Sequence, residues 1–300
     1  KKQRMPEVST QHDAALPPPE GLARGDFDLV VRRLADDMVF GTDASLFVGG
    51  GLEYASSRPY QIGDSVRLLN WRLTARTGRP HVRQYEALKR IAVYIVVDTS
   101  ASMSVGSTAR SKHDIAVWMA SALGLIAQRR MSPVAIVGAG ERTVPITPSL
   151  IRNDLWRAIE PLRLGDVSEQ THLGERLERL TMRAGRRSVF VVISDLHDPA
   201  AIGALRHAAQ KHDCMVIHTQ DPAEITPLRA GFYRGQEAET GRGFFGWGKK
   251  SAVEAHRVAE THAELLRCGV DYLAVRTDES FIGPLRHFLA SRGAAMRGRG

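Results

Sequence analysis

Residues 91–102 read Ile-Ala-Val-Tyr-Ile-Val-Val-Asp-Thr-Ser-Ala-Ser, and this stretch decides the fold that the sequence predicts. Its first seven residues form a continuous apolar run, which is typical of a strand buried on both faces of a parallel sheet. The run ends at Asp98. A second apolar run, Ser188–Ile193, leads in the same way to Ser194 and Asp195. Ligands of open α/β sheets bind outside the carboxyl ends of the strands, so two aspartates at such ends are the main clue to function.

Strand-like and helical segments alternate from Ile91 to near the end of the chain. We expect strands at 91–97, 134–138, 188–193, 214–219 and 270–275, with 142–146 as a candidate neighbour. We expect helices at 113–130, 152–161, 173–184, 199–212, 252–268 and 281–291. Strands separated by helices pair in parallel through right-handed crossovers. The pattern therefore predicts an α/β fold with a doubly wound, mainly parallel, Rossmann-like sheet over residues 91–292.

The region before Ile91 has a different rhythm. Residues 1–25 are polar and contain Pro17-Pro18-Pro19, which predicts a flexible N-terminal arm. A helix at 27–37 follows, and then short strand-like segments alternate with turn signals. We expect those strands at 52–54, 66–71 and 81–85. Residues 26–90 are therefore predicted to form a helix plus a small β-rich lobe, and residues 293–300 a basic tail.

The composition is that of an ordinary globular protein. The 300 residues are 43% hydrophobic and 25% charged, with a net charge of +8 that permits an acidic partner without proving one. Two cysteines are too few to staple a chain of this size and favour a reducing compartment. The most apolar runs are shorter than the roughly 18–20 residues that span a bilayer, and no apolar leader follows Lys1. We expect a cytoplasmic protein without a membrane span.

Hydroxyl and carboxylate side chains at the strand ends predict a metal site. Asp98, Ser100 and Ser102 alternate after the first strand, Asp195 follows another strand, and Thr171 precedes a helix. Such hard oxygen ligands suit Mg²⁺ or Mn²⁺. A cation held by neutral hydroxyls and two aspartates keeps an open position that attracts a partner's carboxylate. Helix caps and turns also use these residue types, and that structural role stays open for the Asp98 loop alone.

Two motifs carry a family resemblance. Asp98-x-Ser100-x-Ser102, with Thr171 and Asp195, resembles the metal-ion-dependent adhesion site (MIDAS) of von Willebrand factor A-type domains. The chain also resembles bacterial family fifty-eight of the domains of unknown function, over roughly residues 25–290. That likeness rests on Tyr54, Arg58–Arg67, Asn70-Trp71 and Thr74–Gly78 upstream, and on Asp221–Glu224, Pro227, Gly231 and Glu239–Gly241 downstream.

The resemblance implies a von Willebrand A-like domain with an N-terminal β-rich extension. We expect the protein to have no catalytic activity. Such proteins are typically encoded beside MoxR-type AAA+ ATPases, with which they are thought to mature or assemble protein complexes. The implied partner is that ATPase or its client. Many relatives carry membrane helices, and this chain shows none. Two departures from the family pattern are His172 after Thr171 and His197 near Asp195, which could tune metal preference without breaking the ligand set.

Other functions stay open on the sequence alone. Residues 53–90 carry eight Lys and Arg against three acids, with aromatic residues interleaved, so this lobe could bind single-stranded nucleic acid. Asp98 could instead be the nucleophile of a metal-dependent phosphohydrolase, although Ser100 stands where such enzymes have a second aspartate. Zinc ligation by His207, His212, Cys214 and His218 fits no ligand spacing that we recognise. The Gly-rich aromatic segment 231–250 is either a cover for the sheet or a contact surface.

Overall fold

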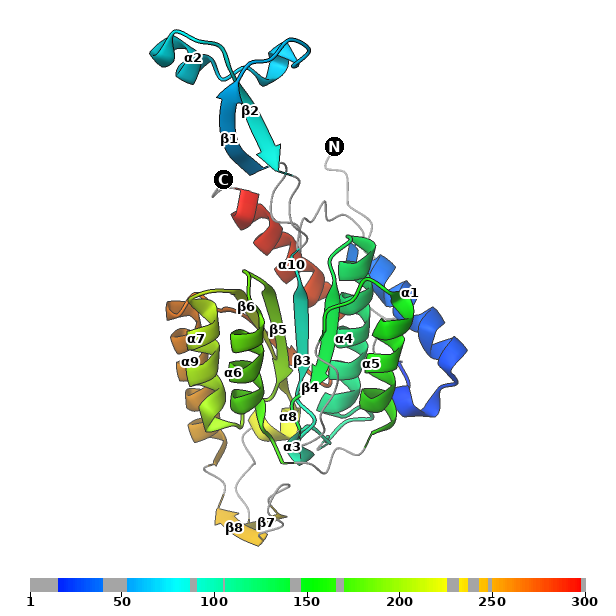
Figure 1. Ribbon diagram of the computed structural model, residues 1–300. Helices are drawn as coiled ribbons and strands as arrows, with labels where there is room; N and C mark the ends of the chain where they lie inside the picture. The colour runs from blue at the N-terminus through cyan, green and yellow to red at the C-terminus, as the bar shows by residue number, and fades with distance from the viewer. Residues whose placement is uncertain are drawn as a thin grey trace, which may run out of the picture.

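The computed structural model describes residues 16–39, 53–86, 91–104, 106–140, 147–165, 170–225, 232–236, 243–247 and 250–297. The candidate strand at 142–146 and residues 1–15 of the predicted arm lie outside these ranges. Figure 1 shows a sheet with helices on both faces and a separate small lobe beyond one end of the strands.

A five-stranded parallel sheet forms the centre, in the order β4-β3-β5-β6-β9. The strands are β3 (Val93–Val97), β4 (Val134–Gly138), β5 (Val189–Ser194), β6 (Asp213–Gln220) and β9 (Asp271–Arg276). All residues of β3, β4 and β5 are buried, which explains their unbroken apolar sequences. The doubly wound, Rossmann-like α/β fold is confirmed.

The helices divide between two cores, and successive residues of β3 face them alternately. Val93 and Ile95 pack with the face covered by α1 (Arg24–Val39), α4 (Lys112–Arg129), α5 (Arg152–Leu164) and α10 (Ile282–Arg297). Tyr94 and Val96 pack with the face covered by α6 (Leu173–Arg183), α7 (Pro199–Ala209) and α9 (Lys250–Arg267). The chain leaves β3 toward β4 and then returns to β5 on the other side of β3. The topological switch point therefore lies between β3 and β5.

Residues 17–39 pack on the α/β domain. The sequence had predicted a flexible arm up to residue 25 and a helix that belongs with the β lobe. Phe27 of α1 stacks on Trp118 of α4 with ring centroids 4.7 Å apart, inside the core of the α/β domain. The indole of Trp118 donates to the Pro17 carbonyl, and Arg163 donates to the carbonyls of Pro19 and Leu22. Residues 17–39 are therefore held against the sheet domain, with Pro19–Gly21 as the 3₁₀ turn η1.

The small lobe is an antiparallel hairpin with short helices inserted. Strand β1 (Glu53–Pro59) pairs with β2 (His81–Glu86). The strand expected at 66–71 is wrong: Val66–Leu68 is the 3₁₀ turn η2, and Trp71–Thr77 is the helix α2. The side chain of Asn70 caps α2 by accepting from the Leu73 amide, and Gly78 ends it with a left-handed φ of 70°.

The structure adds elements that the sequence did not predict. They are α3 (Ala101–Ser104), α8 (Pro222–Ile225) and the hairpin of β7 (Phe232–Gln236) with β8 (Gly243–Trp247). Helix α10 continues to Arg297, so most of the predicted basic tail is helical. Among the described helices, none has the length and apolar character needed to cross a bilayer.

A close approach of α6 to α7 gives a test of this packing. A Cβ atom on Gly174 would lie 2.6 Å from the Cβ of Ala200 and 2.8 Å from its carbonyl carbon, so the two helices would have to separate. We expect Gly174→Ala to destabilise the protein by about 1–3 kcal/mol in urea unfolding. The matched change Gly203→Ala, on the exposed side of α7 with no atom within 4 Å, should stabilise it by about 0.5–1 kcal/mol. A Gly174→Ala variant as stable as wild type would contradict this packing.

Candidate metal centre

The predicted site lies where the two central strands end. Asp98 follows β3 and Asp195 follows β5, and these strands are hydrogen-bonded neighbours on either side of the switch point. The Asp98 amide donates to the Ile193 carbonyl at 2.9 Å, which ties the two strand ends together. Both aspartates are buried, at 0% and 4% exposure. The parallel pairing thus brings two carboxylates from distant parts of the chain to one edge.

The loop after β3 is folded around the Asp98 carboxylate. Oδ1 accepts from the Ser100 amide at 3.0 Å, and Oδ2 accepts from the Ser194 hydroxyl at 2.7 Å. The hydroxyls of Ser100 and Ser102 lie 3.0 Å apart and are also buried. Three of the residues predicted as ligands, Asp98, Ser100 and Ser102, are therefore brought together in one turn.

Thr171 reaches the same edge through backbone contacts. The amide of the next residue, His172, donates to the Ala139 carbonyl, and the Ala139 amide donates to the Val97 carbonyl just before Asp98. The Gly174 amide donates to Asp198 Oδ2 at 2.7 Å, which holds the start of α6. No hydrogen bond joins Thr171 to the other four predicted ligands, since its Oγ1 has no partner among the described residues. The structure thus brings the chain beside Thr171 to this edge, while the Thr171 hydroxyl makes no hydrogen bond to the Asp98 loop.

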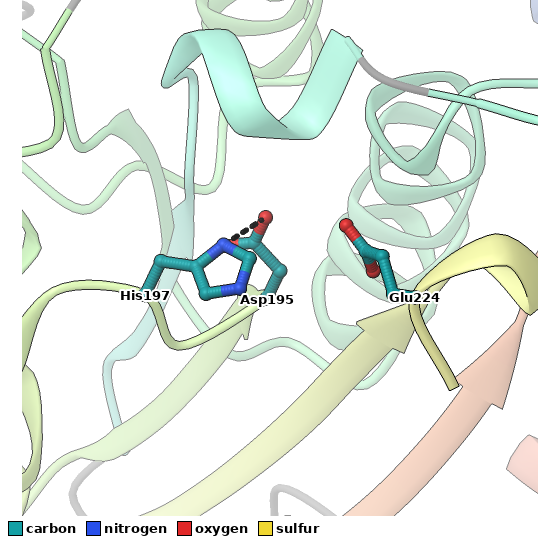
Figure 2. Close-up of side chains that lie close together, drawn as sticks. All are labelled: Asp195, His197 and Glu224. Carbon is teal, nitrogen blue, oxygen red and sulfur yellow. Dashed lines mark ion pairs between the residues drawn. The ribbon is translucent and has the colours of Figure 1, made fainter. Parts of the chain in front are cut away.

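A buried lysine is the feature that sequence reasoning missed. Lys112 is 0% exposed, and its Nζ lies 2.7 Å from Asp195 Oδ2 and 2.5 Å from Glu224 Oε1. His197 Nδ1 lies 3.1 Å from the same Asp195 oxygen, as Figure 2 shows. Leu196 between them has a left-handed φ of 57°, a strained conformation that turns the chain so that His197 faces Asp195.

The position of Lys112 in its helix makes its positive charge energetically unfavourable unless carboxylates neutralise it. Ser111 and Asp114 form a capping box at the start of α4, so Lys112 is the first helical residue. A cation there meets the positive end of the helix dipole as well as the cost of burial. Burial opposes the charge, but Asp195 and Glu224 outweigh it and raise the pKa of Lys112 above its usual value. The sequence did offer a signal for this buried lysine, because Lys112 directly follows the cap residue Ser111 and opens an apolar helix.

The two aspartates respond differently to the same surroundings. Burial, and then the nearby charge of Asp195, raise the pKa of Asp98 above its usual value. Burial also opposes the charge of Asp195, but His197 and Lys112 outweigh it and hold the pKa of Asp195 below its usual range. Asp195 is thus the carboxylate of the pair that stays ionised, whereas Asp98 forms no ion pair with a described residue.

The donor set fits a hard divalent cation. Asp195 and Glu224 share the ammonium of Lys112, and Asp195 also contacts His197. Asp98 forms no ion pair with a described residue, so its carboxylate is the one that a cation would neutralise. Asp195 Oδ1 and Thr171 Oγ1 are buried oxygens without a hydrogen-bond partner among the described residues. Buried polar atoms are rarely left without a partner, and oxygen donors of this kind suit Mg²⁺ or Mn²⁺.

A second group of donors overlaps this site. One ligand atom each from Asp195, His197 and Glu224 lie within 4.8 Å of one another. Lys112 is bonded to two of these three residues, so an ammonium already neutralises this side of the site. Glu224 belongs to the motif Asp221–Glu224 that carried the family resemblance, but the sequence assigned it no role.

The remaining histidines and cysteines have other partners. His218 is buried, with Nδ1 2.6 Å from the Tyr272 hydroxyl, and Cys214 is a buried free thiol. Burial raises the pKa of Cys214 to about 12, so it stays an unreactive thiol. Among the described residues, the only group of three or more His, Cys, Asp or Glu side chains close enough to share a metal ion is that of Asp195, His197 and Glu224. The zinc arrangement that the sequence analysis disfavoured is not formed by these side chains.

Fold and site together define an open α/β protein with a buried acidic and hydroxyl-lined centre at its switch point. More particularly, the chain belongs to the family described as protein of unknown function DUF58, whose model matches residues 56–252. The uncharacterized proteins Mb1516 of Mycobacterium bovis and Rv1480 of Mycobacterium tuberculosis are each 30% identical over 302 residues, covering 91% of this chain and 94% of theirs.

One solved structure matches part of the chain. The crystal structure of Deinococcus radiodurans RO (RSR) protein matches with 17% sequence identity and a TM-score of 0.34. The match covers 67% of this chain and 34% of that one.

The buried His218 predicts how stability depends on pH. Burial lowers the pKa of His218 to about 4, below the value near 6.5 of an unfolded histidine, so the unfolded chain binds the proton first. Stability is therefore full above pH 6.5 and falls as the pH drops toward 4, by about 3 kcal/mol from this residue. Urea unfolding of His218→Gln should show a smaller loss over that range, and the exposed control His207→Gln should behave as wild type. Equal losses in all three proteins would contradict this.

Lys112 predicts how the site behaves without its internal cation. With metal chelated, we expect Lys112→Met to lose about 3–5 kcal/mol of stability because the buried Asp195 and Glu224 lose their shared ammonium, leaving Asp195 only its contact with His197. Added Mn²⁺ should restore more stability to Lys112→Met than to wild type, because no ammonium then opposes the cation. Urea unfolding with and without Mn²⁺ measures both effects, with the exposed Lys211→Met as control. A variant that matches wild type in chelator would show that Lys112 does not balance the site.

Proposed function

We propose that this protein is a non-catalytic, metal-dependent protein-interaction module. In this proposal Asp98, Ser100, Ser102, Thr171 and Asp195 hold Mg²⁺ or Mn²⁺ as a MIDAS does, and the metal presents an open position to a carboxylate of a partner. The observation that carries the proposal is a pair of buried oxygens, Asp195 Oδ1 and Thr171 Oγ1, that have no hydrogen-bond partner among the described residues, together with the buried carboxylate of Asp98. When bound, the metal supplies a Lewis-acidic position for an incoming anion.

The chain's own residues prepare the site for this task. Lys112 and His197 both engage Oδ2 of Asp195, which leaves Oδ1 as its available oxygen. The Ser100 amide and Ser194 hydroxyl orient Asp98 in a similar way. Contacts that fix the orientation of a ligand are what a metal site needs beyond the ligands themselves.

A non-catalytic role is favoured over phosphoryl transfer by what lies beside Asp98. Ser100 occupies the position of the second aspartate of aspartyl phosphotransferases, and its hydroxyl faces that of Ser102. A neutral hydroxyl pair is a poor general acid near neutral pH. The arrangement suits binding of a cation better than protonation of a leaving group.

The proposed partner is a MoxR-type AAA+ ATPase or its client, and the proposed process is assembly or maturation of protein complexes. Both come from the resemblance to MIDAS-containing relatives. We place this activity in the cytoplasm, where the two free thiols of Cys214 and Cys268 would stay reduced.

Removing the charge of Asp98 tests the proposal. Asp98→Asn keeps the size of the side chain, and without metal it should be at least as stable as wild type because repulsion from Asp195 is relieved. The same variant should lose binding of Mn²⁺ in calorimetric titration and lose the thermal stabilisation that Mg²⁺ gives wild type. Asp36→Asn, an exposed acid of α1, is the control that keeps both.

Partner binding gives the second half of this test. Pull-down of the ATPase from extract should require a divalent cation and should fail with chelator or with Asp98→Asn. If wild type binds no divalent cation, or if capture of the ATPase ignores both chelator and Asp98→Asn, the metal-dependent clasp is wrong.

A further inference from the structure

We propose that the tip of the small lobe is a docking surface for an acidic partner protein, separate from the metal centre. The apolar tip is defined as Ile62, Val66, Leu68 and Trp71. The arginine rim around it is defined as Arg67, Arg72, Arg76, Arg79 and Arg83. Both lie in the segment between β1 and β2 or on β2 itself.

The apolar tip is concentrated and uncovered. Ile62 is 102% exposed and Trp71 is 66% exposed, and Val66 and Leu68 are exposed as well. These four large apolar residues fall within ten positions of the chain. Single exposed apolar residues are ordinary, but four of them in one short segment, with a tryptophan among them, are typical of a protein-binding surface.

The lobe does not need these side chains for its own structure. Val82 is buried in the hairpin, Asn70 caps α2, and the His81 amide donates to the Thr74 hydroxyl. Arg58 forms a two-pronged ion pair with Asp64 that closes the turn after β1. The tip and rim can therefore be changed while the lobe keeps its internal contacts.

The charge around the tip selects the partner. Residues 65–85 contain five arginines and no acidic residue. All five are exposed, and none forms an ion pair with a described residue, whereas Arg58 is paired. Arginine at the rim of an apolar centre is complementary to a partner that carries carboxylates around an apolar side chain.

The chemistry of the tip favours a protein over a nucleic acid. Single-stranded nucleic acid is held by aromatic platforms that stack on successive bases, together with basic side chains. The tip has one aromatic residue and three aliphatic ones, which offer nothing to a phosphate or a base stack. Tryptophan and arginine, which the tip and the rim respectively supply, are the residue types that carry most of the binding energy at protein–protein interfaces.

The position of the lobe makes this surface independent of the metal site. Strand β2 leads toward the amino end of β3, whereas Asp98 follows its carboxyl end. Figure 1 shows the lobe beyond one end of the sheet and α3 and α8 at the other end. A partner on the tip therefore need not approach the metal centre.

Site-specific photocrosslinking in cells of the source organism tests the proposal. The full-length chain carries p-benzoylphenylalanine in place of Trp71, with the same group in place of Met182 as control. Met182 is 75% exposed on α6. Irradiation should give a discrete, nuclease-resistant protein adduct from position 71 and none of that mass from position 182. The captured protein should be acidic by mass-spectrometric identification.

Two further variants make the result decisive. Reversing the rim charges with Arg72→Glu and Arg76→Glu should lower the adduct at least tenfold, with circular dichroism confirming that the lobe is still folded. Asp98→Asn should leave the adduct unchanged, which separates this surface from the metal-dependent clasp. The proposal is overturned by no adduct, by an adduct that nuclease removes, by the same adduct from position 182, or by an adduct that survives charge reversal.

Discussion

Two buried carboxylates at neighbouring strand ends impose the constraint on which the rest of the site depends. Parallel pairing of β3 with β5 brings Asp98 and Asp195 to one edge, where burial removes the water that would screen them. Asp98 is held by an amide and a hydroxyl, and Asp195 by the ammonium of Lys112. Three local features stabilise these buried carboxylates. The turn after β3 donates to Asp98, the lysine at the start of α4 pairs with Asp195, and the strained Leu196 turns His197 toward Asp195.

The centre of the sheet could be predicted from the sequence because β3, β4 and β5 are buried on both faces. Their runs show no alternation, and β4 was predicted to the residue. The helix α1 was also predicted, but its packing was not, because Phe27 finds its partner Trp118 far along the chain. In the lobe, Val66 and Trp71 suggested a strand by residue type, whereas the cap formed by Asn70 and the left-handed Gly78 decided for a short helix. Local hydrogen bonds outweighed β propensity there.

The candidate site could be predicted only in part for a similar reason. Strand ends converge by topology, so Asp98, Ser100, Ser102 and Asp195 could be grouped before any coordinates were known. The Lys112 ion pairs could not, because they join α4 to residues 83 and 112 positions away and depend on the rotation of the helix. Thr171 was predicted only in part. Its loop lies at the predicted edge, but its hydroxyl has no hydrogen-bond partner among the described residues that would define its role.

A clasp of one carboxylate on one metal buries little surface, so by itself it would bind weakly and exchange quickly. The apolar tip is likewise small. On the proposed functions, a partner bound at either of these surfaces would therefore dissociate readily. When no metal is bound, the ammonium of Lys112 neutralises part of the carboxylate charge and so helps the site to stay folded. Contacts that dissociate readily suit a protein that brings components together and releases them, rather than one that transforms a substrate.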